Sequence, residues 1–145
     1  MTKKHDDKEM QKRYVQLQLL KQYATAMIEE KGNLESRISE IAVTMHAVEK
    51  LNEVKKGQEM LASLGAEVYI NSSIEDAGSM VIGLGSGIYA KKTIKEAEEI
   101  LGNRRKELEE AHQNIMEEVT QLVEQIEILE NQMQGHVASA RNETD

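Results

Sequence analysis

The chain has 145 residues, a formal net charge of -8, and no cysteine, proline, phenylalanine or tryptophan. The acidic balance argues against a nucleic-acid partner, because proteins that bind the phosphate backbone usually present a basic face. The absence of cysteine excludes disulfides and thiolate chemistry. Aromatic residues, which usually dominate a compact core, are only 3% of the chain. Without proline, nothing in the composition forbids very long helices.

The chain shows no sign of a membrane or export segment. No window approaches the roughly 18 apolar residues of a membrane span. The first residues, MTKKHDDKEMQKRY, are charged and lack the apolar stretch of a signal peptide. We therefore expect a cytoplasmic protein that does not bind membranes.

The first flank of the chain has the spacing of a coiled coil. We expect residues 1–7 to be disordered and residues 8–56 to form one helix with an apolar seam. Ten of its fourteen seam positions are apolar. The a positions are Met10, Leu17, Ala24, Lys31, Ile38, Met45 and Asn52, and the d positions are Arg13, Leu20, Met27, Leu34, Ile41, Val48 and Lys55.

The middle segment, residues 57–92, holds six of the nine glycines, three of them in VIGLGSGIYAKK at residues 81–92. A dinucleotide fingerprint needs G-x-G-x-x-G, but its third glycine position is occupied here by Ile88. No second strand follows in the order that such a fold requires. We instead expect a β-hairpin whose tight turn uses the positive φ angles of Gly85-Ser86-Gly87.

A similar unit of strand, turn and strand precedes it, with its turn at Gly65-Ala66. Two short hairpins cannot bury both of their faces alone, and their open edges recruit other strands. We therefore expect the middle segments of several subunits to assemble into an oligomeric β-barrel. The residues expected to carry this oligomerisation are Leu61, Leu64, Val68, Ile70, Val81, Ile82, Leu84 and Ile88.

The second flank, residues 93–140, repeats the helical pattern, and residues 141–145 are expected to be disordered. Its six d positions are all apolar, whereas its a positions are apolar only in the second half: Ile94, Leu101, Leu108, Ile115, Leu122 and Leu129 at d; Glu98, Arg105, His112, Val119, Ile126 and Met133 at a. Because the two flanks match in length, we expect a long antiparallel coiled-coil hairpin, and thus a mainly α fold with a small β part. Pairing outward from the middle places Lys31 near Glu118.

The chain resembles the α class of prefoldin, an archaeal and eukaryotic holdase chaperone. The resemblance covers about residues 10 to 140, and its most specific parts are LASLGAEVYI at 61–70, VIGLGSGIYAKKT at 81–93 and IKEAEE at 94–99. The two hairpins expected between the helices resemble the arrangement of the α class, because β-class subunits have only one hairpin there. The first hairpin here lacks the proline that family members often carry.

This resemblance implies a hexamer of two α-class and four β-class subunits, whose coiled coils hang from a double β-barrel. It also implies capture of non-native client proteins at the coiled-coil tips and delivery to a group II chaperonin, without ATP and without a cofactor. Several apolar residues near the free ends lie outside the seam, and exposed patches of this kind usually mark interaction sites. The alternative is that they pack around a splayed coiled-coil end. The candidate client-binding residues are Tyr14, Val15, Leu17, Leu19, Leu20, Ile126, Ile128, Leu129, Met133 and Val137.

We do not expect an enzyme. The four histidines have no metal-ligand spacing, and no pair of carboxylates has a pattern that indicates an enclosed acid-base site. The remaining alternative is a structural protein of the same family that forms homo-oligomers or filaments through its strands.

Overall fold

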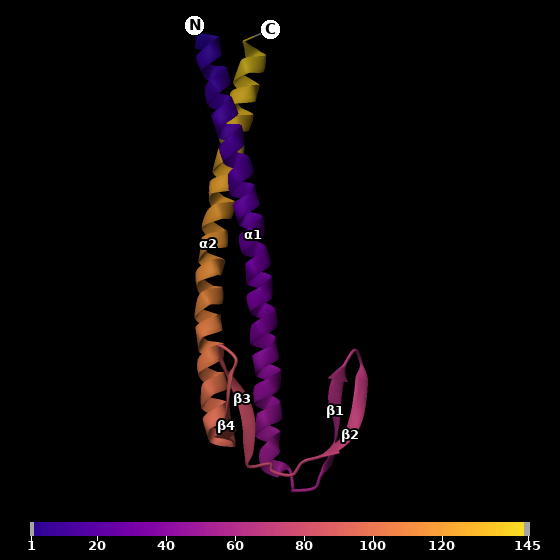
Figure 1. Ribbon diagram of the computed structural model, residues 1–145. Coiled ribbons are helices and arrows are strands. Elements are labelled where there is room, and N and C mark those ends of the chain that lie inside the picture. Colours follow the sequence, from indigo (N-terminus) through magenta and orange to yellow (C-terminus); the bar gives the residue numbers. More distant parts are fainter. Residues whose placement is uncertain (1, 144–145) are drawn as a thin grey trace. The chain divides into compact units, whose positions relative to one another are not determined.

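A computed structural model describes residues 2–143. Helix α1 (Thr2–Lys50) and a 3-10 turn (Leu51–Glu53) lead into strands β1 (Glu59–Gly65), β2 (Val68–Ser73), β3 (Ser79–Gly85) and β4 (Ile88–Thr93), and helix α2 (Ile94–Asn142) follows (Figure 1). The expected class, two long antiparallel helices with two β-hairpins between them, is confirmed.

The helices differ in extent from the expected ranges. Helix α1 begins at Thr2 instead of residue 8, because nothing in the charged first residues interrupts a helix. It ends at Lys50 instead of residue 56, because Val54 is extended and Gly57 has a φ of +87°. Helix α2 continues to Asn142. Met1, Thr144 and Asp145, which fall in segments expected to be disordered, lie outside the described residues.

The chain divides into two compact units. We call the described part of residues 1–36 and 109–145 the helix unit, and residues 37–108 the hairpin unit. The predicted seam is buried in both: every a and d position from Met10 to Val48 and from Ile94 to Met133 is buried or half-buried, except Arg105. The heptad pattern thus predicted the packed face of each helix. The most deeply buried side chains of the helix unit are Leu17, Ala24, Leu34, Leu122 and Leu129.

The hairpin unit has its own core, in which one hairpin packs against the helices. Val48, Ala97 and Leu101 form the buried centre, and Met80 and Ile82 of β3 pack against it. The Arg104 guanidinium on α2 also donates a hydrogen bond to the backbone carbonyl of Gly83. Hairpin β3–β4 is therefore fixed to α2 by both apolar and polar contacts.

Helix α2 begins with a capping box. Thr93 Oγ1 accepts a hydrogen bond from the backbone N–H of Glu96 at 3.2 Å, and the backbone N–H of Thr93 donates to Glu96 Oε1 at 3.5 Å. This reciprocal arrangement satisfies amide groups that the first helical turn would otherwise leave unpaired. It fixes the point at which β4 ends and α2 starts.

The two hairpins are copies of one another, offset by twenty residues. Residues 59–73 and 79–93 pair in the same register, each with an irregularity just before the turn. The turn residues have positive φ in both hairpins: Gly65, Ala66 and Glu67 in the first, Gly85, Ser86 and Gly87 in the second. Four residue types recur at the shared positions, namely Met60/Met80, Leu64/Leu84, Gly65/Gly85 and Tyr69/Tyr89.

The two copies differ in what covers them. In β3–β4 the face that carries Met80, Ile82 and Ala90 is half-buried because it packs toward the helices. In β1–β2 the equivalent face keeps Met60 and Ile70 about half exposed. Hairpin β1–β2 therefore presents apolar side chains to solvent from both of its faces.

Candidate functional site

The free end of the helix unit carries a band without formal charge. Helix α1 has no charged residue at 14–20, and α2 has none at 131–140 if His136 is counted as neutral. Lys21 and Glu130, at the edges of these two segments, form an ion pair with Nζ and Oε1 2.5 Å apart. The two segments therefore lie at the same level, and together we call them the neutral band.

The candidate client-binding residues fall into two groups. Five of them lie outside the seam and are between 50% and 60% exposed: Tyr14, Val15, Leu19, Ile128 and Val137. The other five belong to the seam and are buried or half-buried: Leu17, Leu20, Ile126, Leu129 and Met133. The exposed group forms an apolar surface, whereas the seam group holds the two helices together beneath it.

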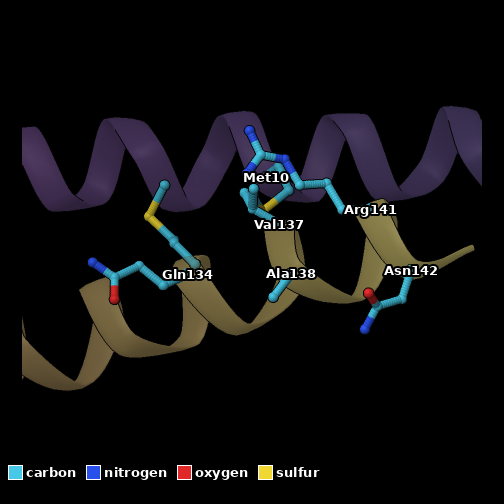
Figure 2. A pocket seen from close by; sticks show the side chains of 7 residues that line it. Met10, Gln134, Val137, Ala138, Arg141 and Asn142 are labelled. Carbon is cyan, nitrogen blue, oxygen red and sulfur yellow. The ribbon is translucent and has the colours of Figure 1, made fainter. Parts of the chain in front are cut away.

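Three open grooves, each of about 300 Å³ or more, lie along this end of the described helix unit. The first has a volume of about 490 Å³ and lies between Met10 of α1 and Met133, Val137 and Ala138 of α2 (Figure 2). The second, of about 430 Å³, is lined by Met10, Gln11, Tyr14, Val15 and Met133. The heptad pattern assigned Met10 only to the seam. Met10 also lines two grooves, because the end of α2 lies opposite it.

The third groove, of about 300 Å³, has a more polar rim. Leu20, Ile128 and Leu129 line it together with Gln16, Gln125 and Gln132, and Arg13 lies at one end. No sequence motif indicated this groove, because its residues come from two helices and glutamine has no characteristic spacing.

Polar contacts between the helices lie beyond the neutral band. The Tyr23 hydroxyl donates to Glu118, which raises the pKa of Tyr23. Glu35 lies 2.9 Å from the imidazole of His112 and 3.0 Å from Lys31 Nζ. Hydrogen bonds from His112, and then from Lys31, hold the pKa of Glu35 below its ordinary value.

The alignment that placed Lys31 near Glu118 is correct to within a few residues, since Glu35 lies beside His112, but no ion pair forms between Lys31 and Glu118. Lys31 instead pairs with Glu35 one turn along its own helix, and Glu118 accepts from Tyr23. Side chains four residues apart on a helix are close neighbours. The stagger of the two helices also places Tyr23, which the heptad count had left unassigned, opposite Glu118.

The hairpins hold the second candidate surface. Seven of the eight residues expected to carry oligomerisation are between 46% and 69% exposed: Leu61, Leu64, Val68, Ile70, Val81, Leu84 and Ile88. Ile82 differs, because it is half-buried against the hairpin unit's own core. Tyr69, Tyr89 and Met60 were not predicted but are exposed beside these residues. Because side chains alternate between the two faces of a strand, the sequence could have identified the two tyrosines as members of this surface.

The glycine-rich stretch forms part of this surface and not a phosphate cradle. Gly85 and Gly87 adopt positive φ in the turn between β3 and β4. Among residues 2–143 there is no group of three or more acidic, histidine or cysteine side chains placed to hold a metal ion. In the same part of the chain no helix is long and apolar enough to cross a membrane.

A family model described as prefoldin subunit matches residues 20–138, which is most of the chain. The chain belongs to the prefoldin family. The resemblance read from the hairpin motifs is thereby confirmed, and prefoldin is a family of chaperones and not of enzymes.

Similar proteins within the prefoldin family are archaeal α subunits. Prefoldin subunit alpha of Archaeoglobus fulgidus is 25% identical over 127 residues, covering 88% of this chain and 93% of the relative. That of Thermofilum pendens is 26% identical over 113 residues, covering 78% and 88%. A solved structure of filamentous prefoldin from Methanocaldococcus jannaschii matches with a TM-score of 0.70 and 18% identity, covering 78% of this chain and 93% of that one. At this identity the match shows a shared fold.

Proposed function

We propose that this prefoldin α subunit captures non-native proteins at the neutral band and passes them to a group II chaperonin without using ATP. The observation that carries the proposal is the band itself, where Tyr14, Val15 and Leu19 are exposed within a segment, residues 14–20, that holds no charged residue. Exposed apolar patches on soluble proteins usually mark interaction sites. Prefoldin is a cytosolic family, which supports a cytosolic location for this chain.

The composition of the grooves fits clients of varied sequence. Met10 and Met133 line two of the three grooves. Methionine is unbranched and adapts its shape, which suits a surface that must accept unrelated apolar segments. The band itself holds no charged residue, and the charged residues that line the three grooves, Arg13 and Arg141, lie just outside it.

The hairpins support assembly with other subunits. Both faces of β1–β2 and the outer face of β3–β4 carry exposed apolar residues, such as Leu61, Ile70 and Val81. Each two-stranded sheet also has unpaired edges. We propose that these strands join β-class subunits in an α2β4 hexamer through a shared β-barrel.

Client capture is tested with the variant Tyr14→Ser/Val15→Ser/Leu19→Ser. Co-assembled with its β-class partner, it should lose most of its ability to suppress aggregation of a chemically denatured protein, measured by light scattering. The matched control is Ile28→Ser/Val43→Ser/Val123→Ser, which changes three exposed apolar residues that line none of the three grooves. Equal suppression by the two triple variants would contradict capture at the band.

Delivery needs a separate measurement. A fluorescent client preloaded on the hexamer should move to a purified group II chaperonin, and energy transfer between client and chaperonin should rise. Retention of the client on the hexamer would contradict this step while leaving capture intact.

A second candidate is a homo-oligomer or filament formed by the chain alone. It is favoured by the solved filamentous prefoldin of the same fold. Native mass measurement separates the two: a hexamer formed only with the β-class subunit supports the first candidate, and long assemblies of the single chain support the second.

A further inference from the structure

The third groove combines apolar walls with amide groups at its rim. Leu20 and Ile128 supply apolar surface, and Gln16, Gln125 and Gln132 line the same groove. We call this the amide groove. Arg13 is its only charged lining residue. A purely apolar client site would not need three side chains that each both donate and accept hydrogen bonds.

The amides at this groove are not used to join the helices. Tyr23 and Glu118 are hydrogen-bonded across the helix pair. Gln16 lies one heptad before Tyr23, and Gln125 lies one heptad after Glu118, so Gln16 and Gln125 occupy the equivalent cross-helix positions. Within the described residues the amide side chains of Gln16, Gln125 and Gln132 make no hydrogen bond to another part of the chain. Their donors and acceptors therefore face solvent.

We propose that the amide groove binds the main chain of an extended, non-native polypeptide segment. The inference rests on the proposed capture function and names the feature of the client that is recognised. A backbone presents alternating N–H donors and C=O acceptors, and one glutamine amide can pair with both. In a folded protein nearly all buried backbone groups are already paired. Free backbone groups are therefore a property that all unfolded chains share and folded chains lack.

The charges at the groove do not oppose such an occupant, because Arg13, the one charged lining residue, is paired with Glu9 at 3.3 Å. The main chain carries no net charge, and a ring of carboxylates or ammonium groups would favour clients of one sign. Leu20 and Ile128 would receive client side chains while the amides hold the backbone between them. Recognition would then depend little on the client's sequence.

The variant Gln16→Met/Gln125→Met separates this proposal from purely apolar recognition, because the two predict changes of opposite sign. Methionine has nearly the same length and helix propensity as glutamine but cannot replace its hydrogen bonds. If the amides bind the main chain, the dissociation constant should rise at least about fivefold, as expected for two lost hydrogen bonds. If only apolar contact matters, binding should tighten.

The probe is reduced, carboxymethylated lactalbumin, which stays unfolded, and its binding to the subunit co-assembled with its β-class partner is measured by fluorescence anisotropy. The control variant is Gln22→Met/Gln121→Met, which makes the same change once on each helix outside all three grooves. Circular dichroism melting verifies that both variants fold. Unchanged or tighter binding by the groove variant would overturn the proposal.

A peptide pair gives a second readout that needs no mutation. A capped peptide of alternating valine and serine should compete with the lactalbumin, and the same peptide with alternate backbone nitrogens methylated should compete at least about fivefold less well. Equal competition would overturn main-chain recognition while capture itself stands. Failure of the wild-type assembly to bind lactalbumin at all would instead overturn the proposed function.

Discussion

Lys21 Nζ lies 2.5 Å from Glu130 Oε1, and this ion pair joins α1 to α2 where the neutral band ends. Between this ion pair and the free end of the helix unit, the buried seam holds the helices together and other apolar side chains are exposed to solvent. In the other direction polar links between the helices begin, with Tyr23 donating to Glu118 and His112 beside Glu35. The Lys21–Glu130 ion pair therefore separates the exposed apolar surface near the free end from the part of the coiled coil whose helices are joined by polar contacts.

Reversing one charge of this pair should destabilise the helix unit. Both side chains are partly exposed, so we expect Lys21→Glu to lower the free energy of unfolding by roughly 0.5–1 kcal/mol. The swap Lys21→Glu/Glu130→Lys should recover most of that loss. Thermal unfolding at low salt measures both variants, and added salt should shrink the difference. A swap no more stable than the single variant would show that the pair does not couple the helices.

Protonation of Glu96 should weaken the start of α2. Hydrogen bonds from Thr93, and then from Lys92, hold the pKa of Glu96 below the ordinary value of 4.5. The folded state therefore favours the charged form. This contribution is complete above the unfolded-state pKa and is lost as pH falls through the lowered folded-state value.

The Glu96→Gln variant isolates this effect, because glutamine keeps the capping geometry without titrating. The melting temperature of the natural chain should exceed that of the variant above about pH 5, and the excess should disappear under more acidic conditions. The comparison removes the parallel contributions of Glu35 and Asp76, whose pKa values are also lowered. A difference that stays constant with pH would contradict the assignment.

The repeated hairpins allow an exchange between equivalent turn positions. Glu67 has a φ of +62°, which is costly for a residue with a side chain, and its counterpart Gly87 has a φ of +74°. We expect Glu67→Gly to stabilise the first hairpin and Gly87→Glu to destabilise the second, each by about 1 kcal/mol. A Cβ at Gly87 would meet no atom within 4 Å, so the effect comes from the backbone. Thermal unfolding measures both, and changes of the same sign would contradict the shared turn geometry.

Removing the Arg104 guanidinium should loosen hairpin β3–β4 from α2. Its hydrogen bond to the Gly83 carbonyl is charge-assisted and partly buried. In Arg104→Met, backbone amides of β3 and β4 should exchange with solvent at least roughly ten times faster. Lys106→Met, at an exposed position two residues further along α2, serves as the control. Unchanged protection in Arg104→Met would mean that the contacts of Met80 and Ile82 hold the hairpin alone.

Part of the candidate site could be read from the sequence. Tyr14, Val15 and Leu19 were identified because they are apolar at positions that the heptad pattern does not use, and they are exposed. The amide groove could not be identified, since Gln16 and Gln125 lie far apart in sequence and line one groove only once the two helices pack together. Exposed glutamines on a helix carry no signal until a groove is seen between them.

The sequence by itself determined the local features of this protein. These are the seam of α1, which begins at Met10, the seam of α2, which ends at Met133, the hairpin turns and the positions of the strands. These follow from helical periodicity and from the φ angles that residues such as Gly85 and Gly87 adopt without strain. Only the tertiary structure decided that Glu118 meets Tyr23 instead of Lys31, and that Ile82 packs inward while Ile70 remains exposed. The physical reason is that the stagger of two helices and the choice of which hairpin packs on them depend on the sum of many contacts. Those contacts join residues from distant parts of the chain, so no single stretch of sequence predicts them.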